Sequence, residues 1–258
     1  RWSMQGRYAQ WPRSIHGKLF FSQGGLNYVC SGTVIGGSTI ATAGHCVAAG
    51  DGSTWSSNFL FCPSYTQSGV NPAVGCWSGV GATTSGPWFS VRDFDYDYAC
   101  IVTAVTGTVR SAKVGSVTGT AGRAANAASV YPTIQFGYPS AAPFNGAVIQ
   151  QVATTEWYER DTTAGGQVSK YVGSDLTPGS SGGGWFLSWR HPNAEFADTD
   201  ANPTTDPFGA QNGPFLNGVT SHRRSAYNQE MASPQFLNTA ASGESEDIFQ
   251  GCLAHANN

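Results

Sequence analysis

The sequence has few charged residues and no long hydrophobic run. Asp, Glu, Lys and Arg make up only 11% of its 258 residues, and the net charge is -3. No basic run is longer than the pair Arg223 and Arg224, so the chain offers no strongly basic surface for nucleic acid or an anionic membrane. No stretch approaches the roughly 20 apolar residues that span a bilayer. We therefore expect neither nucleic acid nor a membrane as a partner.

Cysteine pairs of the C-x-x-C type are also missing, which excludes zinc-ribbon and thioredoxin-like spacing. An even number of cysteines in a chain poor in lysine and rich in Ser, Thr and Gly favours three disulfides and an oxidising compartment. Spacing alone leaves every pairing open. The first residues contain no apolar signal-peptide core, so we expect a processed, soluble, secreted product. The six cysteines are Cys30, Cys46, Cys62, Cys76, Cys100 and Cys252.

Short segments of alternating or β-branched character, separated by turn residues, dominate the chain. Many short strands at this spacing indicate a sandwich or a barrel. A helical pattern is visible only over 43–49, as one turn, and over 242–256, where apolar residues share one face. The segments predicted as strands cover residues 18–22, 30–36, 38–44, 96–105, 129–139, 147–159, 168–174, 185–189 and 215–221.

Two regions lack a strand pattern. Residues 103–130 are rich in Ala, Gly, Thr and Val, and we expect the connection between two halves of the protein there. Residues 189–214 are polar and rich in Asp, Asn and Pro, which is typical of a surface loop. Asp198, Asp200 and Asp206 in this loop match no complete set of calcium ligands, so we predict no metal site.

The segment TPGSSGGGW (177–185) places Ser181 among small residues that let the backbone turn sharply and expose the hydroxyl. Its glycines permit positive φ and a close approach of substrate, so the N–H groups of Gly179 and Ser181 would be able to converge on an oxyanion. Runs of Gly and Ser are more often flexible turns, and this motif alone does not define a site.

A serine nucleophile needs a base, and histidine is the usual base near neutral pH. His45 follows a β-branched segment and stands next to Cys46, where a disulfide would hold it. The remaining histidines lack this setting, and we interpret them as incidental. These are His16, His191, His222 and His255.

The imidazole in turn needs a buried carboxylate that fixes its tautomer. Asp97 lies at the start of the apolar segment FDYDYACIV (94–102), where its carboxylate can be buried, whereas we expect Asp93 and Asp95 to be solvated. Taken alone, Asp97 fits a strand-end cap equally well.

The blocks TAGHC, DYACI and PGSSGG, in the order His, Asp, Ser, resemble the three signature blocks of chymotrypsin-fold serine proteases. The residues within these blocks are similar to those of the bacterial secreted glutamyl-endopeptidase-like branch. The resemblance covers nearly the whole chain. It implies an all-β fold of two six-stranded antiparallel Greek-key barrels packed face to face, with a C-terminal helix. Residues 1–115 would form the first barrel and 116–258 the second barrel with the helix.

The resemblance implies a secreted, monomeric serine endopeptidase that hydrolyses proteins or peptides through an acyl-enzyme and needs no metal or organic cofactor. His45, Asp97 and Ser181 would form the catalytic triad, and the N–H groups of Gly179 and Ser181 the oxyanion hole. The alternative is a secreted virulence or binding module of the same fold with restricted or lost turnover. An esterase is a weaker option, because Ser181 is not expected on the strand-to-helix elbow of that class and the order Ser, Asp, His is not followed.

The resemblance also implies pairings and specificity residues. Cys30 would pair with Cys46, Cys62 with Cys76 and Cys100 with Cys252. Ser180 stands where zymogen-activated enzymes have an aspartate, so that mode of activation is not expected. Asp175 would form the base of the primary specificity pocket and strand 217–223 its wall. The expected substrate-binding residues are Asp175, Thr220, Ser221, which would also bind the Asp97 carboxylate, and Arg223.

Overall fold

The computed structural model describes residues 2–3, 9–127, 131–160, 168–187, 214–223, 229–238 and 243–258. The predicted loop 189–214, with its three aspartates and His191, lies almost wholly outside these residues. Among the described residues, no helix is long and apolar enough to cross a lipid bilayer.

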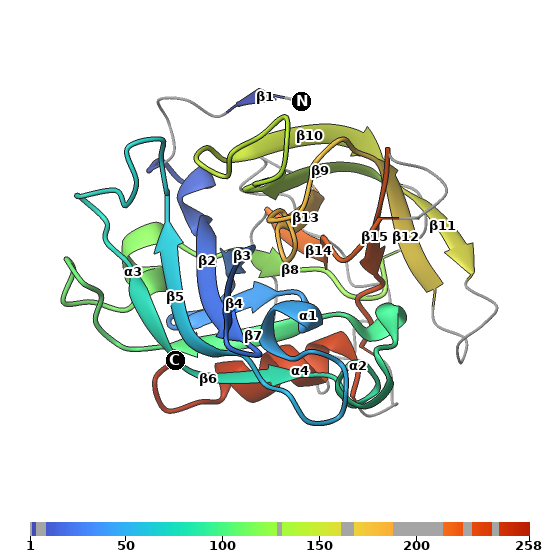
Figure 1. The fold of residues 1–258 in the computed structure, drawn as a ribbon, viewed down its shortest axis with the longest axis horizontal. Coiled ribbons are helices and arrows are strands. Elements are labelled where there is room, and N and C mark those ends of the chain that lie inside the picture. The colour runs from blue at the N-terminus through green and yellow to red at the C-terminus, as the bar shows by residue number, and fades with distance from the viewer. Residues whose placement is uncertain are drawn as a thin grey trace.

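Six antiparallel strands of the first half close into a barrel in the order β2-β3-β4-β7-β6-β5 (Figure 1). Its interior is apolar, with Leu19, Ile40 and Phe61 almost fully buried. We predicted four of these strands, and missed β5 and β6 because neither shows a β-branched alternation. The strands are β2 (His16–Gln23), β3 (Leu26–Val34), β4 (Thr39–Thr42), β5 (Ser57–Pro63), β6 (Trp77–Thr84) and β7 (Ala99–Thr103).

The second half contains a six-stranded sheet, β1-β10-β9-β13-β14-β8, and a three-stranded sheet, β11-β12-β15. All pairings are antiparallel except that of β8 with β14. The strands are β1 (Trp2–Ser3), β8 (Gly122–Arg123), β9 (Pro132–Gly137), β10 (Gln150–Thr155), β11 (Trp157–Arg160), β12 (Val168–Gly173), β13 (Gly184–Leu187), β14 (Phe215–Val219) and β15 (Glu230–Pro234).

Two connections join these sheets into a second barrel. Glu156 alone separates β10 from β11, so one long strand runs from the first sheet into the other. Beyond the end of β14, the Ser221 N–H donates to the Ala232 carbonyl at 2.9 Å, and the Ala232 N–H donates to the His222 carbonyl at 2.8 Å. The ring β9-β10/β11-β12-β15-β14-β13 is thereby closed, which confirms the predicted all-β fold with two barrels.

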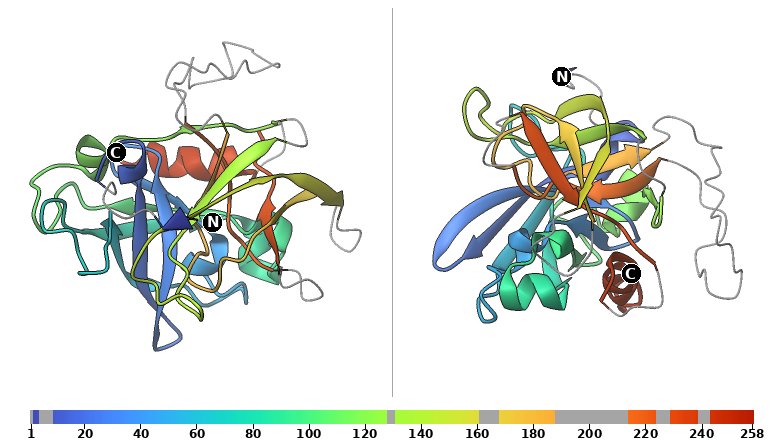
Figure 2. Two further views of the ribbon diagram at one scale, coloured as in Figure 1. Left: turned by 90° about the horizontal axis from the view of Figure 1, so that it is seen from above. Right: turned by 90° about the vertical axis from the view of Figure 1, so that its right-hand side faces the viewer.

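Short helices occupy the connections. They are η1 (Arg13–Ile15), α1 (Gly44–Val47), α2 (Gly86–Val91), η2 (Phe94–Tyr96) and α3 (Val114–Thr118). The C-terminal helix α4 (Ser245–Leu253) follows the second barrel in sequence but packs against β7 of the first (Figure 2). The disulfide Cys100–Cys252 joins α4 to that strand. The division of the chain at residue 115 stays a prediction.

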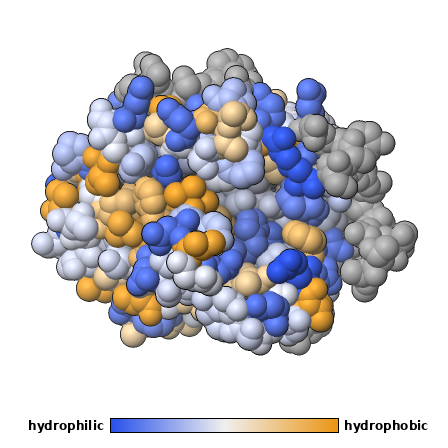
Figure 3. Space-filling view, in the orientation of Figure 1, coloured by the Kyte–Doolittle hydropathy of each residue, from blue (hydrophilic) through white to orange (hydrophobic). Residues whose placement is uncertain are grey.

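The six cysteines form Cys30–Cys46, Cys62–Cys76 and Cys100–Cys252, the pairs that the resemblance implies. Each pair has at least one cysteine in a strand of the first barrel. The large hydrophobic side chains that are exposed also all fall between Trp11 and Val109 among the described residues. In Figure 3 the orange residues accordingly gather over the first barrel, at the left of the view.

Candidate active site

His45 lies in α1, directly after β4, and Asp97 lies just before β7, which pairs with β4. The Asp97 carboxylate is fully buried and the His45 side chain is 29% exposed. The backbone N–H of His45 donates to Oδ1 of Asp97 at 2.7 Å, and its Nδ1 lies 2.8 Å from Oδ2. Because a carboxylate only accepts hydrogen bonds, the proton is on Nδ1, and Nε2 is left as a base.

The environment of His45 has opposing effects on its pKa. Burial of the imidazole disfavours its charged form, but the negative charge of Asp97 and the hydrogen bond to it outweigh this. The pKa of His45 is raised above its ordinary value of 6.5. A base that needs to be neutral to take a proton therefore reaches that state at a higher pH than a solvated histidine would.

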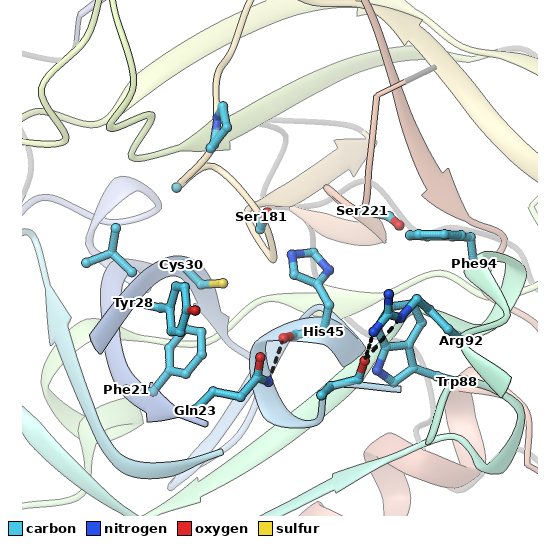
Figure 4. Close-up of a pocket in the computed structure, with 14 residues that line it drawn as sticks. Phe21, Gln23, Tyr28, Cys30, His45, Trp88, Arg92, Phe94, Ser181 and Ser221 are labelled. Carbon is cyan, nitrogen blue, oxygen red and sulfur yellow. Dashed lines mark hydrogen bonds between the residues drawn. The ribbon is translucent and has the colours of Figure 1, made fainter. Parts of the chain in front are cut away.

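A groove of about 440 Å³ brings Ser181 together with His45 (Figure 4). Ser181 stands on a sharp turn between Gly179 (φ +98°) and Gly182 (φ +75°). A Cβ at position 182 would lie 2.0 Å from the Thr42 hydroxyl, so only glycine lets the turn approach the first barrel this closely. The Ser31 N–H also donates to the Ser181 carbonyl at 2.7 Å. The turn that carries Ser181 in the second barrel is thus hydrogen-bonded to β3 of the first barrel and packs closely on β4.

The backbone around Ser181 fixes the direction of the two N–H groups predicted for the oxyanion hole. The Pro178 carbonyl accepts hydrogen bonds from the N–H and Oγ of Ser140 at 2.7 and 3.0 Å, and the Ser180 carbonyl accepts one from the Gly183 N–H at 2.9 Å. In a trans peptide the N–H points opposite to the carbonyl, so the Gly179 and Ser181 N–H groups face the other way. Neither donates to another atom of the described residues.

The predicted substrate-binding residues do not all reach this groove. Ser221 lines it, and its hydroxyl donates to Oδ2 of Asp97 at 2.5 Å. The Thr220 hydroxyl faces the interior of the second barrel, where it accepts hydrogen bonds from Gln135 and Trp185. Asp175 is exposed, and Arg223 is half-buried with its guanidinium donating to the Leu176 carbonyl.

Asp95 corrects one expectation from the sequence. It is only 3% exposed rather than solvated, and it accepts a hydrogen bond from the Ser169 hydroxyl at 2.5 Å. Because Ser169 belongs to β12, this bond joins η2 of the first half to the second barrel.

Aromatic side chains form both ends of the groove, and sequence reasoning missed them. Figure 4 shows Phe21 and Tyr28 on one side of His45, and Trp88 and Phe94 on the other. The Trp88 indole donates to the Ala48 carbonyl at 3.0 Å and meets the His45 ring edge-on at 6.0 Å. These residues come from β2, β3, α2 and η2, and no spacing in the sequence groups them.

Cys30, His45 and Cys46 are close enough to hold a metal ion, and they form the one such cluster among the described residues. The two sulfur atoms are bonded to each other, so they are not available as thiolate ligands. This cluster therefore does not fit a metal site.

No protein-family model and no curated protein matches the sequence. Solved structures do match. The thermostable serine protease AL20 of an extremophilic microorganism is 29% identical with a TM-score of 0.73, over 94% of this chain and 98% of that one. Protease Anisep of Arthrobacter nicotinovorans is 28% identical with a TM-score of 0.73, over 96% of this chain and 99% of that one.

A Glu endopeptidase is 16% identical with a TM-score of 0.63, over 97% of this chain and 94% of that one, a likeness of fold alone. The chain has the trypsin-like fold of chymotrypsin-type serine proteases. Since these neighbours are proteases, the comparison supports a protease function and, with it, a protein or peptide substrate.

Proposed function

We propose that the chain is a secreted serine endopeptidase of the trypsin-like class, with Ser181 as nucleophile, His45 as base and Asp97 as the carboxylate that orients the base. The observation that carries the proposal is the groove in which Ser181 lies beside a histidine bonded twice to a fully buried carboxylate. The three disulfides support an oxidising compartment, hence secretion.

In the proposed reaction, the Ser181 hydroxyl attacks the scissile carbonyl while Nε2 of His45 takes its proton. Asp97 stabilises the imidazolium that forms. The N–H groups of Gly179 and Ser181 donate to the oxyanion, and their fixed direction means that little reorganisation is needed. The imidazolium then protonates the leaving amine, and water, activated by the same base, releases the acyl group. Every step uses groups of this chain.

A fluorophosphonate probe followed by mass spectrometry tests the nucleophile. We expect one adduct, on Ser181, and none in Ser181→Ala, with peptide hydrolysis reduced by about 10⁴- to 10⁶-fold. Ser180→Ala is the matched control. It removes a hydroxyl from the neighbouring residue, but that hydroxyl is buried and donates to the Thr177 carbonyl. Labelling at another serine, or full hydrolysis by Ser181→Ala, would contradict the proposal.

A second candidate is a binding module of this fold with restricted turnover. One observation favours it. Arg223, at the end of the segment expected to form the wall of the primary specificity pocket, donates to the carbonyl of Leu176, which is next to the expected pocket base Asp175. A cation held between wall and base would narrow that pocket. The Ser181→Ala variant separates the two candidates, because a biological effect that survives this substitution belongs to binding.

A further inference from the structure

A second histidine is linked to the predicted triad through Ser221. His222 directly follows Ser221 and is half-buried. Its Nδ1 lies 2.9 Å from the Ser221 hydroxyl oxygen, and the same oxygen lies 2.5 Å from Oδ2 of Asp97. The sequence predicts that His222 is incidental, because nothing in its local sequence resembles the setting of His45, and the structure places it differently.

The direction of these hydrogen bonds follows from counting protons. Ser221 has one hydroxyl proton, and a carboxylate has none to give, so this proton is donated to Asp97. The Ser221 oxygen is then the acceptor in its contact with His222. The Nδ1 of His222 must therefore carry a proton, and the donors run from His222 to Ser221 to Asp97.

Several contacts hold His222 in this position. Its ring packs on the Phe94 ring with centroids 4.4 Å apart, and Phe94 begins η2, the turn that leads to Asp97. Its carbonyl accepts from the Ala232 N–H at 2.8 Å, while the Ser221 N–H donates to the Ala232 carbonyl at 2.9 Å. The backbone of this pair is thus attached to β15 by one bond on each side of the Ser221 side chain.

We propose that His222 is a positioning residue for catalysis, acting through Ser221 on Asp97. A hydroxyl that accepts one hydrogen bond is a better donor in the next, because bonds in a chain polarise one another. The Nδ1–H of His222 also removes the rotational freedom of the Ser221 hydroxyl, and so holds its proton on the carboxylate that orients His45. This inference rests on the proposed function, since the role is defined by the triad.

The tautomer is tested without substrate, by ¹⁵N NMR of the full chain with labelled histidine. We expect His222 to be protonated on Nδ1, and the Nδ1–H resonance of His45 to shift in His222→Phe but not in His255→Phe. His255 is an exposed histidine near the C-terminus and serves as the matched control. A His222 ring without a proton on Nδ1 would overturn the proposal.

Kinetics test the role. His222→Phe keeps a ring against Phe94 but removes the donor, and His222→Asn places an amide N–H near the position of Nδ1. Loss of one such bond predicts that kcat falls about five- to tenfold in the Phe variant, with KM changed less than about twofold, and that the Asn variant recovers most of kcat.

Three results distinguish the failures. An unchanged kcat in His222→Phe overturns this proposal and leaves the proposed function intact. An Asn variant as impaired as the Phe variant also overturns it, because ring shape rather than the donor would then matter. If Ser181→Ala hydrolyses peptides like the parent, the proposed function itself fails, whatever the tautomer of His222.

Discussion

Two buried pairs of a carboxylate and a basic side chain, one from each half of the molecule, are built differently. In the first half, Asp97 accepts three hydrogen bonds, two from His45 and one from Ser221, and its partner His45 opens onto the groove. In the second, Glu156 and Lys170 are both fully buried, with Nζ 3.7 Å from Oε1. The first pair faces a space that a substrate can enter, and the second is closed inside a barrel.

The surroundings of the pairs differ in the same way. The first barrel has an apolar interior, whereas the second places polar groups around Lys170, which donates to the Asn217 carbonyl. Burial lowers the pKa of Lys170 to about 8, although the charge of Glu156 and the contact with it oppose this. A buried pair without solvent access does no chemistry on a substrate. This difference supports the proposed catalytic role of Asp97 and His45, and it predicts a structural role for Glu156 and Lys170.

The largest effect that this comparison predicts is on catalysis. Asp97→Asn removes the acceptor that keeps the His45 proton on Nδ1, and kcat for peptide hydrolysis is expected to fall by about 10⁴-fold. Steady-state kinetics measure it, with the solvent-exposed Asp51→Asn as control. The assignment of reactivity to this pair fails if kcat stays within tenfold of the parent.

For the second pair the expected effect is on folding. Lys170→Met leaves Glu156 buried without its partner, and the free energy of unfolding should fall by about 3–5 kcal/mol. The double variant Glu156→Leu with Lys170→Met should recover most of this loss, because both charges are then absent. Denaturant titration gives these values. A Lys170→Met protein with parental stability but low kcat would show that Lys170 serves catalysis and not folding.

A smaller effect concerns acid stability and a third buried base. His16 lies in β2 and stacks on Phe136 of the second barrel at 4.2 Å, and burial lowers its pKa to about 3. In the unfolded chain the imidazole takes up a proton near pH 6.5, whereas in the folded protein it stays neutral until about pH 3. The contribution of His16 to the free energy of unfolding is therefore complete above pH 6.5 and is lost as the pH falls toward 3.

Between pH 7 and pH 5, His16 should lower the free energy of unfolding by about 2 kcal/mol. Denaturant titrations at the two pH values measure this, and the loss should be smaller by that amount in His16→Gln than in the parent. The exposed His255→Gln is the control and should behave like the parent. Equal losses in all three proteins would show that His16 does not cause the pH dependence of the free energy of unfolding.

Local sequence was sufficient where a short segment defines its own geometry. The glycines around Ser181 predict a sharp turn, and the structure has positive φ at Gly179 and Gly182. The helix predicted over 242–256 is α4, which is three residues shorter at each end. Strands β5 and β6 were missed because they lack alternation, and their place is determined by pairing with β2 and β7.

The role of the specificity residues stays a prediction, and the sequence did not indicate which way their side chains face. Asp175 and Thr220 were assigned by resemblance. Asp175 is exposed, and the Thr220 hydroxyl accepts a hydrogen bond from Gln135 inside the second barrel. Whether a side chain on such a segment faces a groove or a core depends on which neighbours pack against it. Arg223 illustrates this, since its partner is the carbonyl of a residue 47 positions away.

The sequence by itself determined the strand-rich character, the even set of cysteines and the blocks around His45, Asp97 and Ser181, because these depend on backbone preferences and chemistry within a few residues. Only the tertiary structure decided which groups those blocks touch. The family resemblance implied the bond from Ser221 to Asp97, which spans 124 positions. Nothing in the sequence indicated the Glu156–Lys170 pair or the contact of His222 with Phe94, which arise from strands and turns brought together by folding. Hydrogen bonds and burial act over a few ångströms in space, and distance along the chain does not predict them.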